Sequence, residues 1–144
     1  MAAMKTRVKW TGKRTFLGQT DSGHSVVMGG AASHGGADAG VRPMEMLLLG
    51  LGGCTAYDVV DILEKSRQPV TDVVIEIEGQ RAEDIPKVFT HIHVRYIVSG
   101  AGLDPAKVER AVSLSADKYC SATVMLGASA KVSHEIEIVD SGGS

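Results

Sequence analysis

The sequence predicts an α+β fold, and three observations support this prediction. Segments that alternate apolar and polar residues lie near both ends of the chain, as expected for strands with one buried face. A long apolar run with helical spacing separates them, and a second helical pattern lies between the later strands. The chain has 144 residues, enough for one domain with one core, so we expect a single domain over residues 1–144.

The N-terminal part predicts a three-stranded antiparallel meander. Residues 7–10 and 15–17 alternate in a strand-like way around the turn residues 11–13. A second turn at residues 21–23 precedes a third strand over residues 24–28. Residues 29–40 are rich in Gly, Ala and Ser, so we expect a flexible loop there.

A long helix is expected from Pro43 to about Lys65. Proline is favoured at the first helical position, and Glu45 suits the positive end of the helix dipole. Three glycines between residues 50 and 53 each cost roughly 1 kcal/mol in a helix interior. We therefore expect a kink, or very close packing against another backbone, just before Cys54.

The C-terminal half predicts two strands over residues 70–80 and 88–99, then helices, then a last strand over residues 132–138. Asp104 is expected to cap the first of these helices, and the second is expected over residues 121–126. His134 falls on the apolar face of the last strand and is interpreted as a core histidine. Residues 141–144 are expected to be a frayed tail.

The composition excludes several classes of function. A net charge of −2 argues against nucleic-acid binding, which favours a basic surface. We find no apolar stretch of the roughly 18–20 residues that a membrane span needs and no secretory signal, so a cytoplasmic location is expected. Six aromatic residues and 17 glycines predict a thin core, which favours an oligomer.

The chain contains two cysteines, Cys54 and Cys120. Each could be a small core residue. If the glycines break the helix, Cys54 begins a new helical segment, where the dipole favours a thiolate. Cys120 could then convert a sulfenic acid at Cys54 into a disulfide.

The cysteines could also belong to a metal site or to an activated-thiol site. The cysteines could bind a metal together with His91 or His93, but their spacing matches no known zinc motif, so no metal is expected. These histidines are interpreted instead as part of a solvated strand face. An activated thiol would need a cation, and Arg14 and Arg42 are the candidates; a carboxylate such as Glu45 could orient the arginine.

Each of the two cysteines ends a motif. Residues 42–54, Arg-Pro-Met-Glu-Met-Leu-Leu-Leu-Gly-Leu-Gly-Gly-Cys, resemble the proline–glutamate–leucine signature before the first cysteine of the OsmC/Ohr family of organic hydroperoxide resistance proteins. Residues 117–120, Asp-Lys-Tyr-Cys, resemble the segment with the second. Five segments further resemble the YhfA-type branch of this family: Val8–Trp10, Thr15–Gly18, Pro43–Met46, Gly52–Cys54 and Lys118–Cys120.

The resemblance implies an OsmC-like fold, an intertwined homodimer and reduction of organic hydroperoxides or peroxide by a cysteine. Cys54 would be the peroxidatic cysteine and Cys120 the resolving one, with an external dithiol as reductant and no bound cofactor. Family members poise the thiolate with an arginine and a glutamate, here expected to be Arg14 and Glu45. The family glutamate directly follows the proline, whereas Met44 stands there in this chain. The alternative is a non-enzymatic, stress-associated or small-molecule-binding dimer whose cysteines are not catalytic.

Overall fold

The computed structural model describes residues 3–141, and it confirms the predicted α+β class. The chain forms two compact units that divide between Leu47 and Leu48. Of the tail predicted over residues 141–144, all but Ser141 lie outside the described residues.

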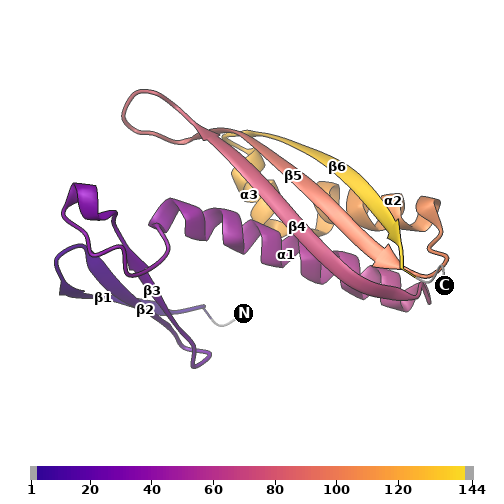
Figure 1. The fold of residues 1–144 in the computed structure, drawn as a ribbon, viewed down its shortest axis with the longest axis horizontal. Helices are drawn as coiled ribbons and strands as arrows, with labels where there is room; N and C mark the ends of the chain where they lie inside the picture. Colours follow the sequence, from indigo (N-terminus) through magenta and orange to yellow (C-terminus); the bar gives the residue numbers. More distant parts are fainter. Residues whose placement is uncertain (1–2, 142–144) are drawn as a thin grey trace. The chain divides into compact units, whose positions relative to one another are not determined.

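The first unit contains the predicted meander (Figure 1). Its strands are β1 (Thr6–Gly12), β2 (Thr15–Thr20) and β3 (Ser25–Gly29), and they pair antiparallel in the order β1-β2-β3. Gly12 and Gly23 have φ of 117° and 91°, a conformation that glycine adopts without strain in the two connecting turns.

The glycine-rich segment after β3 has defined backbone contacts. It contains one 3₁₀ turn, Ala32–His34, and the Asp38 N–H donates to the Gly30 carbonyl at 3.1 Å. The Arg42 guanidinium donates to the Gly40 carbonyl at 2.9 Å and pairs with Asp38. A Cβ at Gly40 would lie 2.3 Å from the Val27 carbonyl oxygen, so this position requires glycine. The expected flexibility of residues 29–40 stays a prediction.

Helix α1 (Pro43–Lys65) is continuous, so the helix does not break before Cys54. At its start, the Glu45 carboxylate accepts a hydrogen bond from the Arg42 backbone N–H at 2.7 Å, one half of a capping box. Farther along, a Cβ at Gly52 would lie 3.0 Å from the Ile77 Cδ1. Close packing against a strand side chain, rather than a kink, therefore accounts for this glycine.

Contrary to the sequence-based expectation, α1 is long and apolar enough to cross a membrane by length and composition. A single such helix is weak evidence, because the core helix of a soluble protein passes the same test. Leu51, Thr55, Val59 and Leu63 form a buried stripe along α1, and 22% of its most apolar window is buried.

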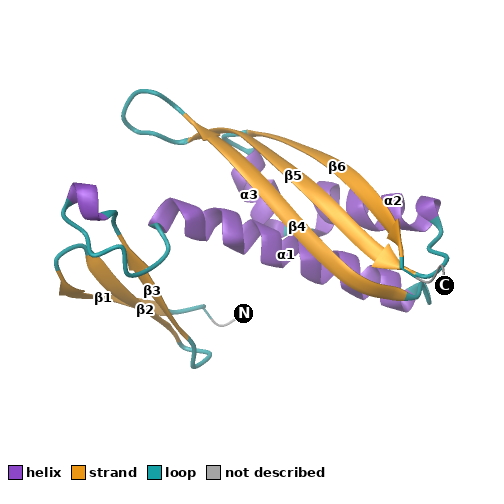
Figure 2. Ribbon diagram, viewed as in Figure 1, coloured by secondary structure: helices purple, strands orange, loops and turns teal. Residues whose placement is uncertain are grey.

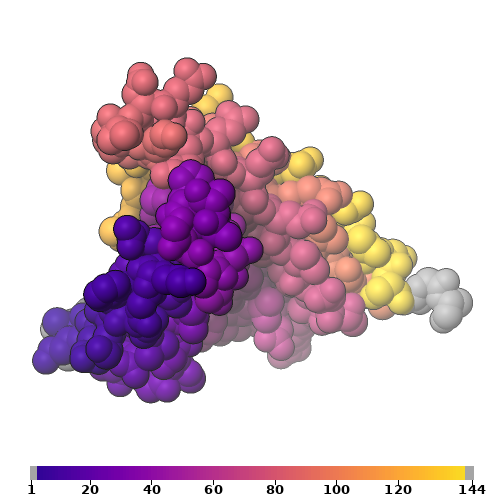
Figure 3. All heavy atoms as spheres, turned by 60° about the vertical axis from the view of Figure 1, so that its left-hand side comes forward, coloured from indigo at the N-terminus to yellow at the C-terminus, as the bar shows by residue number. Residues whose placement is uncertain are grey.

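The second unit contains a three-stranded sheet covered by helices on one face (Figure 2). Strand β5 (Phe89–Gly100) lies between β4 (Val70–Arg81), to which it is antiparallel, and β6 (Lys131–Asp140), to which it is parallel. A parallel neighbour needs a crossover connection, here supplied by α2 (Pro105–Leu114), a π-helical turn (Ser115–Tyr119) and α3 (Ser121–Gly127). The connection between β4 and β5 projects beyond the sheet (Figure 3).

The helical elements and the alternation of β5 follow the sequence closely. The Asp104 side chain caps α2 by accepting from the Ala106 N–H at 3.0 Å, as predicted. The apolar face of β5 packs against α1 and α2 to form the core. The core residues from these three elements are Leu51, Val59, Leu63, Phe89, Ile92, Val94, Tyr96, Val98, Val108, Ala111 and Val112.

The interpretation of His134 as a core histidine is wrong. The residue is exposed, although its ring meets the Tyr96 ring edge-on at a centroid distance of 6.0 Å. The reason is its position on β6, which is the edge strand of this three-stranded sheet.

Candidate active site

Two thiols and one carboxylate meet where α1 packs beside the crossover connection. Cys54 and Asp58 lie one turn apart on α1, on the same side of the helix. Cys120 lies between the π-helical turn and α3. Both sulfur atoms and a carboxylate oxygen of Asp58 lie within 4.8 Å of one another. The fold thus brings together the two cysteines that the sequence singled out, and it adds Asp58, which sequence reasoning missed.

The π-helical turn sets the position of Cys120. Its backbone N–H donates to the Ser115 carbonyl at 2.8 Å, a bond across five residues that is rare and often found at functional sites. Cys120 also caps α3, since its Sγ accepts from the Thr123 backbone N–H at 3.4 Å. Burial raises the pKa of the Cys120 thiol, and the neighbouring Cys54 sulfur adds to this effect. The buried thiol therefore favours its protonated form.

A chain of buried hydroxyl groups ends at the Asp58 carboxylate. Ser115 Oγ donates to Asp58 Oδ2 at 2.9 Å. Thr55 Oγ1 lies 2.7 Å from Ser115 Oγ and 2.7 Å from the Tyr96 hydroxyl, and all three hydroxyl residues are buried. Each hydroxyl has a single proton to donate.

Because each hydroxyl has only one proton, the direction of this chain of hydrogen bonds is fixed. Since an ionised carboxylate can only accept, Ser115 donates to Asp58 and must accept from Thr55. Thr55 must then accept from the Tyr96 O–H. Burial raises the pKa of Tyr96, which keeps this first donor protonated. All three hydroxyls thus point along the chain toward the Asp58 carboxylate, an arrangement in which the bonds strengthen one another.

The other predicted site residues lie in the first unit. Glu45 caps α1 through the backbone N–H of Arg42, and the Arg42 guanidinium holds the Gly40 carbonyl. The Arg14 guanidinium donates to the carbonyl of the adjacent Lys13 at 3.3 Å. The roles expected for Arg14 and Glu45 beside the thiol stay predictions.

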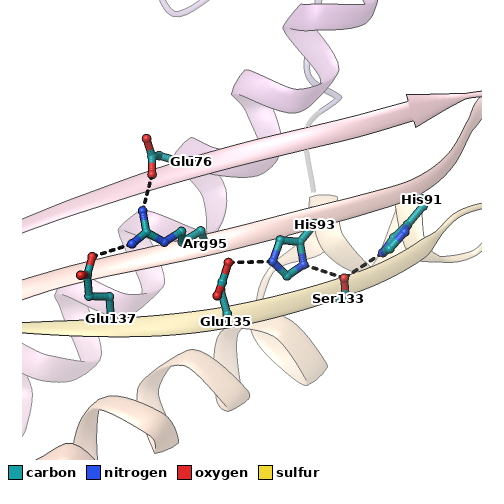
Figure 4. A network of polar contacts seen from close by, with 7 residues as sticks. All are labelled: Glu76, His91, His93, Arg95, Ser133, Glu135 and Glu137. Atoms are coloured by element: carbon teal, nitrogen blue, oxygen red, sulfur yellow. Dashed lines mark hydrogen bonds and ion pairs between the residues drawn. The ribbon is translucent and has the colours of Figure 1, made fainter.

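The histidines do not join the cysteines. His91 Nε2 and His93 Nδ1 each lie 2.8 Å from Ser133 Oγ, and His93 Nε2 lies 3.0 Å from a Glu135 carboxylate oxygen (Figure 4). Their side chains alternate with the buried residues of β5, so they occupy the sheet face away from the helices. Among the described residues, no histidine belongs to the group that Cys54 and Cys120 form.

The same face carries a cross-strand ion-pair cluster. Arg95 lies 2.8 Å from Glu76 on β4 and 2.8 Å from Glu137 on β6. These side chains are partly or largely exposed, as predicted for a solvated strand face. The prediction that the protein holds no metal stays a prediction.

Comparison with known proteins identifies the family. The OsmC-like protein family model matches residues 35–135. Protein YhfA of Escherichia coli K12 is 46% identical over 136 residues, which cover 94% of this chain and 98% of that protein. A solved structure of a hypothetical protein from Aquifex aeolicus is 32% identical, with a TM-score of 0.81 over 97% of this chain and 100% of that one.

A more distant structure shares the fold alone. The organic hydroperoxide resistance protein OhrB of Bacillus subtilis is 19% identical, with a TM-score of 0.65 over 94% of this chain and 98% of that one. The extent of the family match and the similarity to YhfA, together with this fold, confirm the resemblance that the two cysteine motifs carried. The chain belongs to the OsmC-like protein family.

Proposed function

We propose that this protein is a thiol-dependent peroxidase that reduces organic hydroperoxides or peroxide. The observation that carries the proposal is the separation of at most 4.8 Å between the Cys54 and Cys120 sulfur atoms, both of which are free thiols. At this separation, rotation of the two side chains could bring the sulfurs to the bond length of a disulfide, about 2.05 Å. Membership of a family with organic hydroperoxide resistance proteins among its structural neighbours supports the same chemistry.

The exposure of the two thiols supports different roles for them. Cys54 is half-buried, whereas Cys120 is completely buried, so a peroxide reaches Cys54 first. The Cys54 thiolate attacks the O–O bond, becomes a sulfenic acid and releases an alcohol, or water from hydrogen peroxide. Cys120 condenses with the sulfenic acid to form a disulfide and water, and an external dithiol reduces that disulfide by exchange. Arg14 and Glu45 would poise the Cys54 thiolate, and no bound cofactor takes part.

We further propose that the protein acts as a homodimer in the cytoplasm, with neither nucleic acid nor a membrane as partner. The outward side of α1 supports a second copy as its occupant. Leu49 and Tyr57 are 58% and 77% exposed, and a cleft of about 490 Å³ lies along Gly53, Ala56 and Val60 beside Tyr57. A second α1 would cover these apolar side chains, as expected for a small domain with a thin core.

Cumene hydroperoxide consumption in the presence of excess dithiothreitol tests the enzymatic proposal. We expect turnover by the wild type and none by Cys54→Ser. The matched variant Cys120→Ser is treated with excess peroxide and without dithiothreitol. Its Cys54 thiol should react once to the sulfenic acid and then with a second peroxide to the sulfinic acid, since no thiol is left to resolve the sulfenic acid; intact-protein mass spectrometry detects this product. Equal peroxide consumption by the wild type and Cys54→Ser would contradict the proposal.

Thiol titration separates this function from that of a non-enzymatic dimer. After one equivalent of cumene hydroperoxide, a peroxidase loses both thiols, because both enter the disulfide. In a binding protein whose cysteines are not catalytic, both thiols persist.

A further inference from the structure

Asp58 lies beside both cysteines, and the proposed peroxidase reaction assigns it no role. It is half-buried, and one of its carboxylate oxygens lies within 4.8 Å of both sulfur atoms. A carboxylate disfavours a second negative charge so close to it, so it opposes rather than promotes the accumulation of thiolates. The fold nevertheless directs a chain of three buried hydroxyls toward Asp58. Three buried hydroxyls thus hold a carboxylate whose function the thiol chemistry does not explain.

We propose that Asp58 is the base that takes the proton of the Cys120 thiol when the disulfide forms and then gives it to the departing hydroxide. The proposal rests on the proposed function for its oxidant, the Cys54 sulfenic acid. In this step the Cys120 sulfur bonds to the Cys54 sulfur, and the S–O bond of the sulfenic acid breaks. Asp58 begins and ends as a carboxylate, and the products are one disulfide and one water molecule.

The burial of Cys120 explains why the step needs a base. Its side chain is 0% exposed, so water cannot take the proton directly. Burial raises the pKa of this thiol, so its thiolate is a minor species at neutral pH. Only the thiolate is a good nucleophile toward sulfur, and a carboxylate within reach of the thiol removes the proton as the bond forms.

The surroundings of Asp58 supply a hydrogen-bond donor to its carboxylate and a path to solvent. The hydroxyl chain donates to one oxygen, as described above. The side chain also lines a cleft of about 590 Å³ between α1 and α2, through which a proton can exchange with water. The titratable and charged groups around Asp58 come from α1, α2, β5 and the crossover turn, and they are Cys54, Asp61, Lys65, Tyr96, Arg110, Asp117, Tyr119 and Cys120. Lys65 and Arg110 line the same cleft as Asp58.

A single-turnover experiment tests this role. Fully reduced protein is mixed with one equivalent of cumene hydroperoxide, and a sulfenic-acid trap separates formation of the sulfenic acid from formation of the disulfide. In the wild type the rate of disulfide formation should be nearly constant between about pH 6 and pH 8, because Asp58 rather than solvent takes the proton of the Cys120 thiol. In Asp58→Asn that rate should fall at least about tenfold at pH 7 and then rise about tenfold per pH unit, following the thiolate fraction. Sulfenic acid formation should persist in the variant.

Two matched variants show whether the charge at residue 58 is responsible. Asp58→Glu keeps a carboxylate and should restore the flat pH profile, at least in part. Asp61→Asn removes a charge one turn away, in the same cleft, where Asp61 pairs with Lys65 at 2.9 Å, and it should behave like the wild type. Circular dichroism establishes that each variant is folded, and EDTA in every buffer removes any bound cation.

A second oxidant separates this proposal from the proposed function. If the wild-type protein does not react with the peroxide, the peroxidase proposal fails. The role of Asp58 can still be tested with a 2-nitro-5-thiobenzoate mixed disulfide on Cys54. Cys120 must lose the same proton to displace the coloured thiolate. An Asp58→Asn rate and pH profile equal to those of the wild type would overturn the role of Asp58. If Asp58→Asn does not fold, the wild-type profile decides, because a rate that climbs about tenfold per pH unit excludes an internal base.

Discussion

Thr55→Val removes one hydroxyl from the middle of the buried chain and leaves the shape of the side chain almost unchanged. Thr55 is completely buried and makes two hydrogen bonds of 2.7 Å, accepting from Tyr96 and donating to Ser115. In the valine variant the Tyr96 O–H becomes a buried donor without an acceptor, which costs about 1–3 kcal/mol. The lost bond to Ser115 adds about 1 kcal/mol, so we expect the free energy of unfolding to fall by about 2–4 kcal/mol.

Tyr96→Phe removes the first donor of the chain and should cost less. Thr55 keeps its bond to Ser115, and only its oxygen loses a partner, so the expected cost is about 1 kcal/mol. The double variant removes both the donor and the acceptor of the Tyr96–Thr55 bond. It should therefore be more stable than Thr55→Val alone, because no donor is left unpaired.

Urea unfolding at pH 7, followed by circular dichroism, measures all four proteins at one protomer concentration, because association contributes to apparent stability. The reasoning is refuted if Tyr96→Phe costs as much as Thr55→Val. It is also refuted if the two costs simply add in the double variant. Either result would mean that the hydroxyls do not donate in the order from Tyr96 to Asp58.

Two further predictions concern alkaline stability and the outward side of α1. Burial raises the pKa of both Cys120 and Tyr96, so the folded chain holds these protons more tightly than the unfolded chain, whose thiol and phenol have ordinary values of 9.0 and 10.0. The contribution of these two groups to stability is complete below their unfolded pKa values and is lost as the pH rises through their folded pKa values. We therefore expect Tm to fall above about pH 9, and to fall less steeply in Tyr96→Phe. A Tm independent of pH in this range contradicts the assignment. Gly53 is exposed, and a Cβ there would meet no atom within 4 Å beyond its chain neighbours and the nearby backbone of its own helix. Alanine should therefore stabilise an isolated helix by about 1 kcal/mol. If a second copy packs at this position, Gly53→Ala should instead promote dissociation of the dimer on dilution, measured by light scattering; an unchanged mass with higher stability would mean that the face is free.

Local patterns in the sequence predicted most of the secondary structure. Alternation with period two marked the strands, and the face of β5 with Tyr96 is buried as predicted, while His91 and His93 lie on the other face. Capping chemistry marked the start of α2 at Asp104, because a cap depends on residues two or three positions away. Such signals are contained within a few residues, so they can be read without knowledge of the rest of the fold.

The sequence left two alternatives open before Cys54, a kink or close packing, because local patterns could not decide between them. The cost of glycine in a helix is a local quantity, but the stability of a helix in a protein comes mainly from packing of its apolar face. Leu51 and Val59 bury that face, and Gly52 packs closely against Ile77. Local patterns were also insufficient for His134. The alternation of residues in β6 predicted which face of the strand carries His134, but it could not predict that the residue is exposed because β6 lies at the edge of the sheet.

The sequence by itself determined the family, the α+β class and the two cysteines, because each of these is carried by a motif or by a periodic pattern. Only the tertiary structure decided that the two sulfurs lie within 4.8 Å and that Asp58 lies beside both. The same is true of the hydroxyl chain, whose bonds join residues 41 to 60 positions apart. Contacts over such separations depend on how α1 packs against β5 and the crossover turn, and no local pattern encodes that packing.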